Sequence, residues 1–216
     1  MSDYVVKEWS DAGLTCKVYY DDSPPNPRTD WDNLCKLVLP DNRTLDSELD
    51  LGLEWEDEKE DEERLMKKDV YLYCGLYRYE HSGVAYSTGP FGDPWDSGQV
   101  GYIVAMRKDV EKEWGKAKAD TKEVRDLVWQ NMRGEVEALS QWANGEVYGF
   151  VITDDDTDEE IDSCWGFFGD AGIDEIKAEF DVYVEDRKRE EREAFEAENS
   201  LFIASGINPA TLEAVG

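Results

Sequence analysis

The chain contains one histidine and four cysteines, and these residues could together form a nucleophilic site. A cysteine nucleophile needs an imidazole within hydrogen-bond distance of the sulfur and a third group that orients the ring. His81 must therefore belong to any such site, and Cys164, in the string DSCWGF, is the natural thiol. Either Asp96 or Asp162 could orient the imidazole. These four residues define one hypothesis, a Cys/His-dependent enzyme.

The same residues also have a structural interpretation. Cys164 alternates with Trp165 in an apolar run, where cysteine often serves as a small buried side chain. His81 lies in a short polar break, where its ring could bond to the backbone. The sequence has no phosphate loop, dinucleotide fingerprint or cluster of zinc ligands. It therefore favours a protein that is not an enzyme, with no cofactor and no metal.

Acidic residues dominate the composition, with 52 against 23 basic residues and a net charge of −29. Such a chain is repelled by nucleic-acid phosphates and by anionic lipid. We therefore expect a basic protein partner, for example a nucleic-acid-binding one, and no direct contact with nucleic acid or membrane. The four cysteines are scattered, no run of about 18 apolar residues occurs, and no signal-peptide pattern opens the chain. We expect a cytoplasmic protein.

The acidic residues gather in two clusters. The first is an acidic insertion at 46–66, which is either a solvated segment or a presented anionic surface. The second lies at the expected tip of a hairpin. A calcium loop from Asp154 onward would need glycine at its sixth position and glutamate at its twelfth, but the chain has Glu159 and Trp165 there. The predicted binding surface consists of Glu54, Glu56, Asp57, Glu58, Glu60, Asp61, Glu62, Glu63, Asp154, Asp155, Asp156, Asp158, Glu159 and Glu160.

Hydrophobic periodicity predicts an α+β fold with a central antiparallel sheet of about five to seven strands, packed by two long helices. Expected strands are 14–20, one within 31–40 that pairs with it, a three-stranded meander over 70–104 with its tyrosines on one face, 146–152 and 163–168. Expected helices are 108–114, one that starts with a capping box of Asp120 and Glu123, and one that starts at 173. We expect a single domain over 1–200, and a tail or short helix over 201–216.

Four strings together resemble a family of uncharacterised proteins carried by bacteriophages and mobile elements. They are DSPPNPRTDWDNL, YEHSGVAYSTGPFGDPWDSGQVGYI, GEVEALSQWANGEVYGF and DSCWGFFG, and they span most of residues 19–169. The chain departs from the family pattern after Leu34, where family members continue into a segment that contains histidine and arginine. The resemblance implies an accessory protein that acts inside a bacterial cell, and it carries over no catalytic residue.

The acidic charge and this resemblance together predict a non-enzymatic inhibitor, such as an anti-defence or DNA-mimic-like protein that covers a basic host protein. The Cys/His enzyme is one alternative. A highly acidic, salt-adapted protein is the other.

Overall fold

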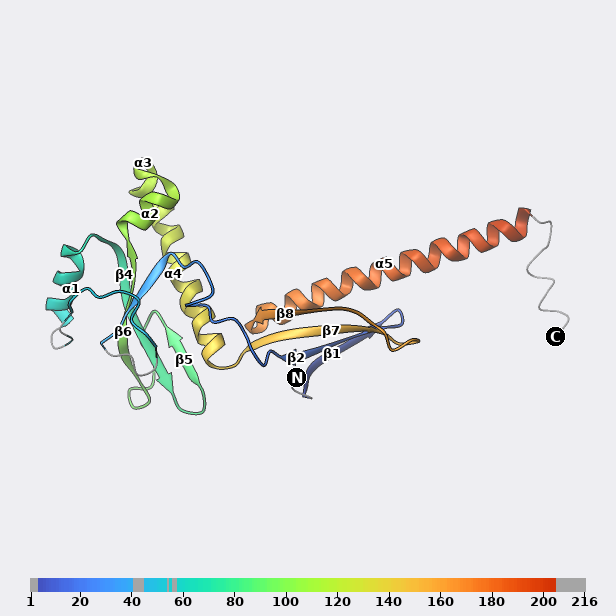
Figure 1. The fold of residues 1–216 in the computed structure, drawn as a ribbon, viewed down its shortest axis with the longest axis horizontal. Helices are drawn as coiled ribbons and strands as arrows, with labels where there is room; N and C mark the ends of the chain where they lie inside the picture. The colour runs from blue at the N-terminus through green and yellow to red at the C-terminus, as the bar shows by residue number, and fades with distance from the viewer. Residues whose placement is uncertain (1–3, 41–44, 54, 56–57, 205–216) are drawn as a thin grey trace. The chain divides into compact units, whose positions relative to one another are not determined.

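The computed structural model describes residues 4–40, 45–53, 55 and 58–204. The chain forms two compact units (Figure 1): unit 1 contains residues 1–22 and 148–216, and unit 2 contains residues 23–147. Each unit has one antiparallel sheet of four strands, which confirms the α+β class. The described strands thus divide between two sheets, whereas the sequence predicted one sheet of five to seven. The single domain expected over 1–200 stays a prediction, since each unit is described by itself.

The sheet of unit 1 has the strand order β1-β2-β7-β8. Its strands are β1 (Val5–Asp11), β2 (Leu14–Tyr20), β7 (Val147–Asp154) and β8 (Glu160–Phe168). Leu14, Cys16 and Val18 of β2 alternate with more exposed residues and are buried on one face. The long helix α5 (Gly169–Ala204) covers that face with Ile176, Phe180 and Val184, which recur every four residues.

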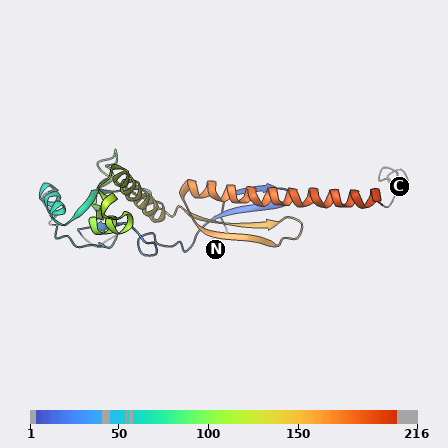
Figure 2. The same ribbon diagram turned by 90° about the horizontal axis from the view of Figure 1, so that it is seen from above.

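Helix α5 continues past the sheet that it covers (Figure 2). All side chains of residues 189–198 are exposed, Phe195 among them at 66%. The predicted helix from residue 173 is therefore confirmed, and so is its solvent-facing continuation. Residues 201–204 end α5, while 205–216 lie outside the described residues.

The sheet of unit 2 has the order β3-β6-β4-β5, and helices lie on both of its faces. The elements of the unit are β3 (Cys35–Val38), α1 (Glu58–Lys67), β4 (Val70–Glu80), β5 (Val84–Ser87), β6 (Ser97–Met106), α2 (Arg107–Trp114), α3 (Lys116–Ala119) and α4 (Lys122–Ala143). The apolar stripe of α4, from Val124 to Leu139, packs on one face, and Leu65 of α1 packs on the other.

The pairing in unit 2 differs from the predicted pairing. β4 lies between β5 and β6, so these strands do not form a meander, and β3 pairs with β6 instead of with β2. The tyrosines of β4 do not share one face, because the register shifts between Val70 and Leu72. Tyr71 packs on the α4 side and Tyr73 on the α1 side.

The start of α4 also differs from the prediction. Thr121 caps the helix by accepting the backbone N–H of Val124, so the predicted capping box of Asp120 and Glu123 is wrong. Asp120 instead pairs with Arg107 at 2.9 Å.

No helix in the described ranges combines the length and the apolar character that a membrane span requires.

Candidate functional site

Among the described residues, a dense group of exposed carboxylates lies at the tip of the β7–β8 hairpin in unit 1. Its turn is shaped by Asp154, whose Oδ1 accepts the backbone N–H groups of Asp156 at 3.0 Å and Thr157 at 3.1 Å. Asp158 takes the left-handed conformation with φ 58°, which short acidic side chains tolerate. The folded turn leaves five side chains exposed, namely Asp155, Asp156, Asp158, Glu159 and Glu160.

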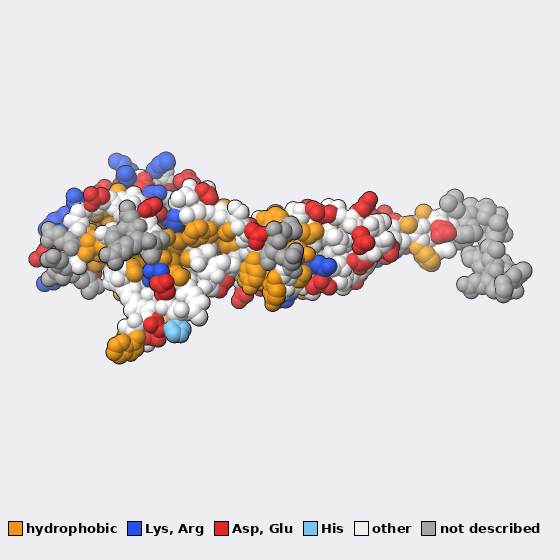
Figure 3. Space-filling model, turned by 60° about the horizontal axis from the view of Figure 1, so that its bottom comes forward, with side chains coloured by type: hydrophobic (Ala, Val, Ile, Leu, Met, Phe, Trp, Pro, Cys, Tyr) orange, Lys and Arg blue, Asp and Glu red, His pale blue; other side chains and the backbone are white. Residues whose placement is uncertain are grey.

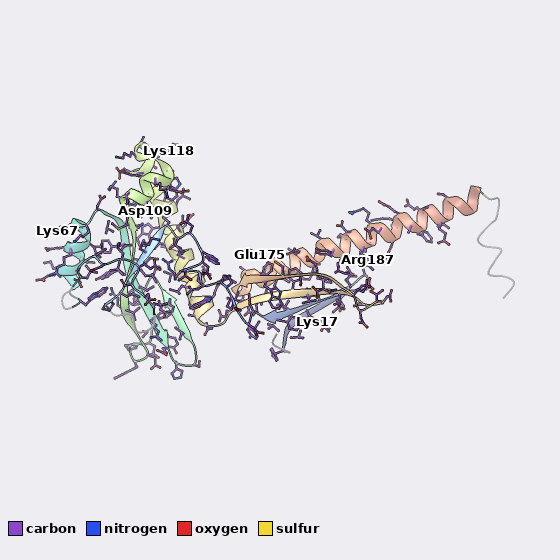
Figure 4. The ribbon with its side chains drawn as sticks, viewed as in Figure 1. Lys17, Lys67, Asp109, Lys118, Glu175 and Arg187 are labelled. Atoms are coloured by element: carbon purple, nitrogen blue, oxygen red, sulfur yellow. The ribbon has the colours of Figure 1, made fainter. Side chains whose placement is uncertain are left out.

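Asp154 differs from its neighbours because it is bound to α5. Its Oδ2 accepts a hydrogen bond from Arg187 at 2.8 Å (Figure 4). This bond, followed by the two backbone hydrogen bonds, lowers the pKa of the Asp154 carboxyl below its usual value of 3.8. Lys188 makes a similar bond to Asp11, at the β1–β2 turn, at 2.9 Å. Two ion pairs therefore attach α5 to the turns at this end of the sheet.

The exposed segment of α5 carries further carboxylates from this point on. Residues 189–198 contain five glutamates and two arginines, a net charge of −3. Glu190 and Glu191 lie near enough to Arg187 to raise its pKa further, after the main effect of the Asp154 hydrogen bond. We call the ten exposed carboxylates together the anionic end of unit 1: Asp155, Asp156, Asp158, Glu159, Glu160, Glu190, Glu191, Glu193, Glu196 and Glu198.

The first acidic cluster is less anionic than its composition suggests. On α1, Glu60 lies 3.9 Å from Arg64 and Glu63 lies 4.0 Å from Lys67, so basic residues of the same helix offset both. Asp61 is only 2% exposed and accepts the backbone N–H of Trp55 at 2.9 Å, so it does not belong to a binding surface.

The other residues of that cluster contribute few exposed carboxylates among the residues that the structure describes. Glu62 is half-buried beside Tyr73, whose pKa is raised by burial and then by Glu62. Glu54, Glu56 and Asp57 lie outside the described residues, and so does the side chain of Glu58. Figure 3 shows basic side chains among the acidic ones over unit 2. Of the six hairpin residues in the predicted surface, five are exposed, whereas Asp154 is bound to Arg187. Their role as a binding surface stays a prediction.

The residues of the Cys/His hypothesis are divided between the two units. In unit 2, the Nδ1 atom of His81 lies 2.9 Å from Oδ2 of Asp96, so one predicted carboxylate does meet the imidazole. Cys164 is exposed on β8 in unit 1, which has no histidine of its own. Asp162 accepts the hydroxyl of Tyr183 at 2.7 Å, and this bond raises the pKa of Tyr183 to about 12. The imidazole and the thiol of the Cys/His hypothesis thus belong to different units, and the hypothesis stays a prediction.

The described residues contain no group of three or more His, Cys, Asp or Glu side chains placed to hold a metal ion. Within the hairpin, Asp154 binds backbone and Arg187, while Asp156 and Asp158 are exposed. The contacts of Asp154 with the backbone thus explain the aspartates at this position as residues that form the turn.

Sequence reasoning missed the acidic extension of α5 as part of this surface. The signal was the string EEREAFEAE beyond Val184, the last buried residue of the apolar stripe.

Neither a protein-family model, nor a curated protein, nor a solved structure matches the chain.

Proposed function

We propose that the protein is a non-enzymatic binding protein whose anionic end docks on a basic surface of another protein. The observation that carries this proposal is the group of ten exposed carboxylates at one end of unit 1. Exposed carboxylates that are not tied to basic neighbours create a field that attracts a cationic partner and speeds its association.

The charge density decides how closely this surface can imitate DNA. The ten residues 189–198 span about 15 Å of helix, over which duplex DNA carries about nine charges. The helix alone, with a net charge of −3, has a third of that density. The five carboxylates of the hairpin tip bring the anionic end to −8, counting Arg189 and Arg192. The hairpin tip lies beside Arg187, before this stretch of helix, so the charge of −8 is spread over more than about 15 Å and the anionic end is less densely charged than DNA. It can still attract a basic surface that accepts DNA.

The resemblance to proteins of phages and mobile elements supplies the cellular setting of the proposal. We propose that the protein acts in the bacterial cytoplasm and blocks a basic, nucleic-acid-binding host protein, as an anti-defence factor would. A surface that imitates nucleic acid needs neither a cofactor nor a nucleophile, so the proposal requires no catalytic role of His81 or Cys164.

The test is affinity capture from bacterial lysate with the immobilised full chain, followed by a competition assay. In a test variant, the tip carboxylates Asp155, Asp156, Asp158, Glu159 and Glu160 are replaced by Asn or Gln. A control variant carries Glu60→Gln and Glu63→Gln on α1, where the carboxylates already have basic partners.

We expect the wild type to retain basic proteins at about 50 mM salt and to release them at about 500 mM, because screening shortens the range of the attraction. The tip variant should retain much less basic protein than the wild type, and the α1 control should retain as much as the wild type. The wild type should also displace duplex DNA from the captured protein. Equal retention by the tip variant, or displacement of no DNA, would contradict the proposal.

A further inference from the structure

Unit 2 contains a hollow of about 830 Å³, in the size range of ligand sites. Its walls come from four places: the segment before β3, strand β3 itself, helix α2 and helix α4. This hollow belongs to unit 2, whereas the anionic end belongs to unit 1, and the proposed function does not involve the hollow.

Two tryptophans line the hollow, Trp31 and Trp114. Trp31 is 42% exposed and Trp114 is half-buried, so both rings keep accessible area. The face of an indole ring carries negative electrostatic potential and attracts a cation placed over it. The walls can therefore receive a positively charged group as well as an apolar stem.

Carboxylates outnumber amines around the same hollow. Asp32, Asp109 and Glu113 line it, and none of them forms an ion pair within the described part of the chain (Figure 4 labels Asp109). A fourth carboxylate, Glu135, is already bound by Arg28 at 2.8 Å. Two lysines, Lys36 and Lys112, also line the hollow and leave it with a net charge of −2. The charge excess again favours a cationic occupant.

The α4 wall of the hollow contains a glycine. Gly134 lies in the helix interior, where glycine costs about 1 kcal/mol relative to alanine. A Cβ atom at Gly134 would meet nothing within 4 Å, so close packing does not require the glycine. The helix thus has a less stable residue at a position that lines the hollow, beside the side chains of Gln130, Asn131 and Glu135.

We propose that this hollow binds an arginine-bearing segment of the basic partner, an inference that rests on the proposed function. Arginine fits the walls better than lysine, since its planar guanidinium can stack on tryptophan and form paired hydrogen bonds to a carboxylate. The volume accommodates a few residues, with one arginine as the anchor between the two indole rings and the three carboxylates without ion pairs.

The test uses three capped peptides of equal length, in which glycines separate three arginines, three lysines or three citrullines. Binding to the full chain is followed by calorimetry and by the NMR signals of the indole N–H groups. Gly134→Leu adds an apolar side chain to the α4 wall of the hollow and should not lower the melting temperature, because leucine is the better helix former. Trp31→Ala removes one wall, and Trp95→Ala is the control, since Trp95 is 91% exposed and does not line the hollow.

We expect the arginine peptide to bind about tenfold more tightly than the lysine peptide of equal charge, and the citrulline peptide to bind least. Gly134→Leu and Trp31→Ala should each weaken arginine binding about tenfold, while Trp95→Ala should not. Equal affinity of folded Gly134→Leu and wild type for the arginine peptide would overturn the assignment of the hollow and leave the proposed function intact. Failure of both cationic peptides to bind the wild type would instead count against the proposed function itself.

Discussion

At the scale of single residues, Arg28 forms four hydrogen bonds through a guanidinium that is nearly buried in unit 2. Its guanidinium donates to Glu48 at 2.7 and 2.8 Å, to Glu135 at 2.8 Å and to the carbonyl oxygen of Cys35 at 2.9 Å. Glu48 also accepts the N–H of Leu37, and Glu135 the N–H of Cys35. One side chain thus joins the proline-rich loop, β3, the segment after β3 and α4, and it fixes the wall from which Glu135 faces the hollow.

Arg28→Met is expected to destabilise the protein strongly. The Arg28 side chain is 5% exposed, and its loss leaves Glu48 and Glu135, at 19% and 11%, without a cation. Removing one partner of a buried ion pair costs about 3–5 kcal/mol. The control is Arg189→Met, which breaks an exposed pair with Asp186 and should cost less than about 1 kcal/mol. Urea unfolding measures the free energy of unfolding of both variants. An equal loss of stability in the two would contradict a buried structural role for Arg28.

At the scale of elements, the contact between the β7–β8 hairpin and α5 depends on pH. The pKa of Asp154 is lowered chiefly by the Arg187 hydrogen bond. A carboxyl with a lowered folded-state pKa stabilises the fold above its unfolded value, near 3.8, and loses that contribution as the pH falls through the folded value. Acid should therefore loosen the helix from the hairpin.

Asp154→Asn tests this dependence, because asparagine keeps the acceptor for the N–H groups of Asp156 and Thr157 and removes the charge that faces Arg187. The wild type should have the higher melting temperature at neutral pH. The difference should shrink as the pH falls below about 5, and it should disappear only below the folded-state pKa of Asp154, which lies under 3.8. A difference that stays constant over this range would show that the charge of Asp154 contributes nothing.

Gly149 and Gly134 differ in the space around them, so substitutions at the two positions can be compared. A Cβ at Gly149 on β7 would lie 2.1 Å from Trp165 and 2.8 Å from the carbonyl oxygen of Cys164, so Gly149→Ala forces the ring and the β8 backbone away. We expect a loss of about 1–3 kcal/mol from overpacking. Gly134→Ala, on an open helix surface, should instead stabilise by up to about 1 kcal/mol. Thermal unfolding compares them, and a gain for both would refute the close approach of Trp165.

These elements also show what the sequence could and could not predict. The alternation of Leu14, Cys16 and Val18 predicted β2, and the helical spacing of apolar residues predicted α4 and α5, because local periodicity reports local structure. β1 was missed, since VVKEWSD is an exposed edge strand with little alternation. The partner of β3 depends on contacts distant in the chain. The burial of Asp61 inside an acidic run depends on which face of α1 meets the sheet, and composition does not report that.

At the scale of the whole molecule, the net charge of −29 is divided unequally. Unit 1 has 25 acidic and seven basic residues, a net charge of −18, and unit 2 has 27 and 16, a net charge of −11. Like charges repel more strongly in the compact state than in the unfolded chain, so this excess opposes folding. The ion pairs of α5 offset only part of it.

Moderate salt should therefore stabilise the protein. The Debye length falls from about 30 Å at 10 mM salt to about 8 Å at 150 mM, so repulsion between exposed carboxylates farther apart than this is largely screened. We expect the melting temperature to rise by several degrees over this range and then to level off. Hydrogen exchange should show the larger gain in the sheet of unit 1, which has the greater charge excess. The variant with five neutralised tip carboxylates should gain less than the wild type.

The shape of this salt dependence also separates two interpretations of the acidic composition. Screening alone saturates once the Debye length is only a few ångströms, at about 1 M salt or below. A protein adapted to high salt would instead be unfolded at low salt and would continue to gain stability at molar concentrations. Such a result would assign the carboxylates to solubility and remove the need for a basic partner. Saturation, together with a folded state at low salt, would leave them free to bind one.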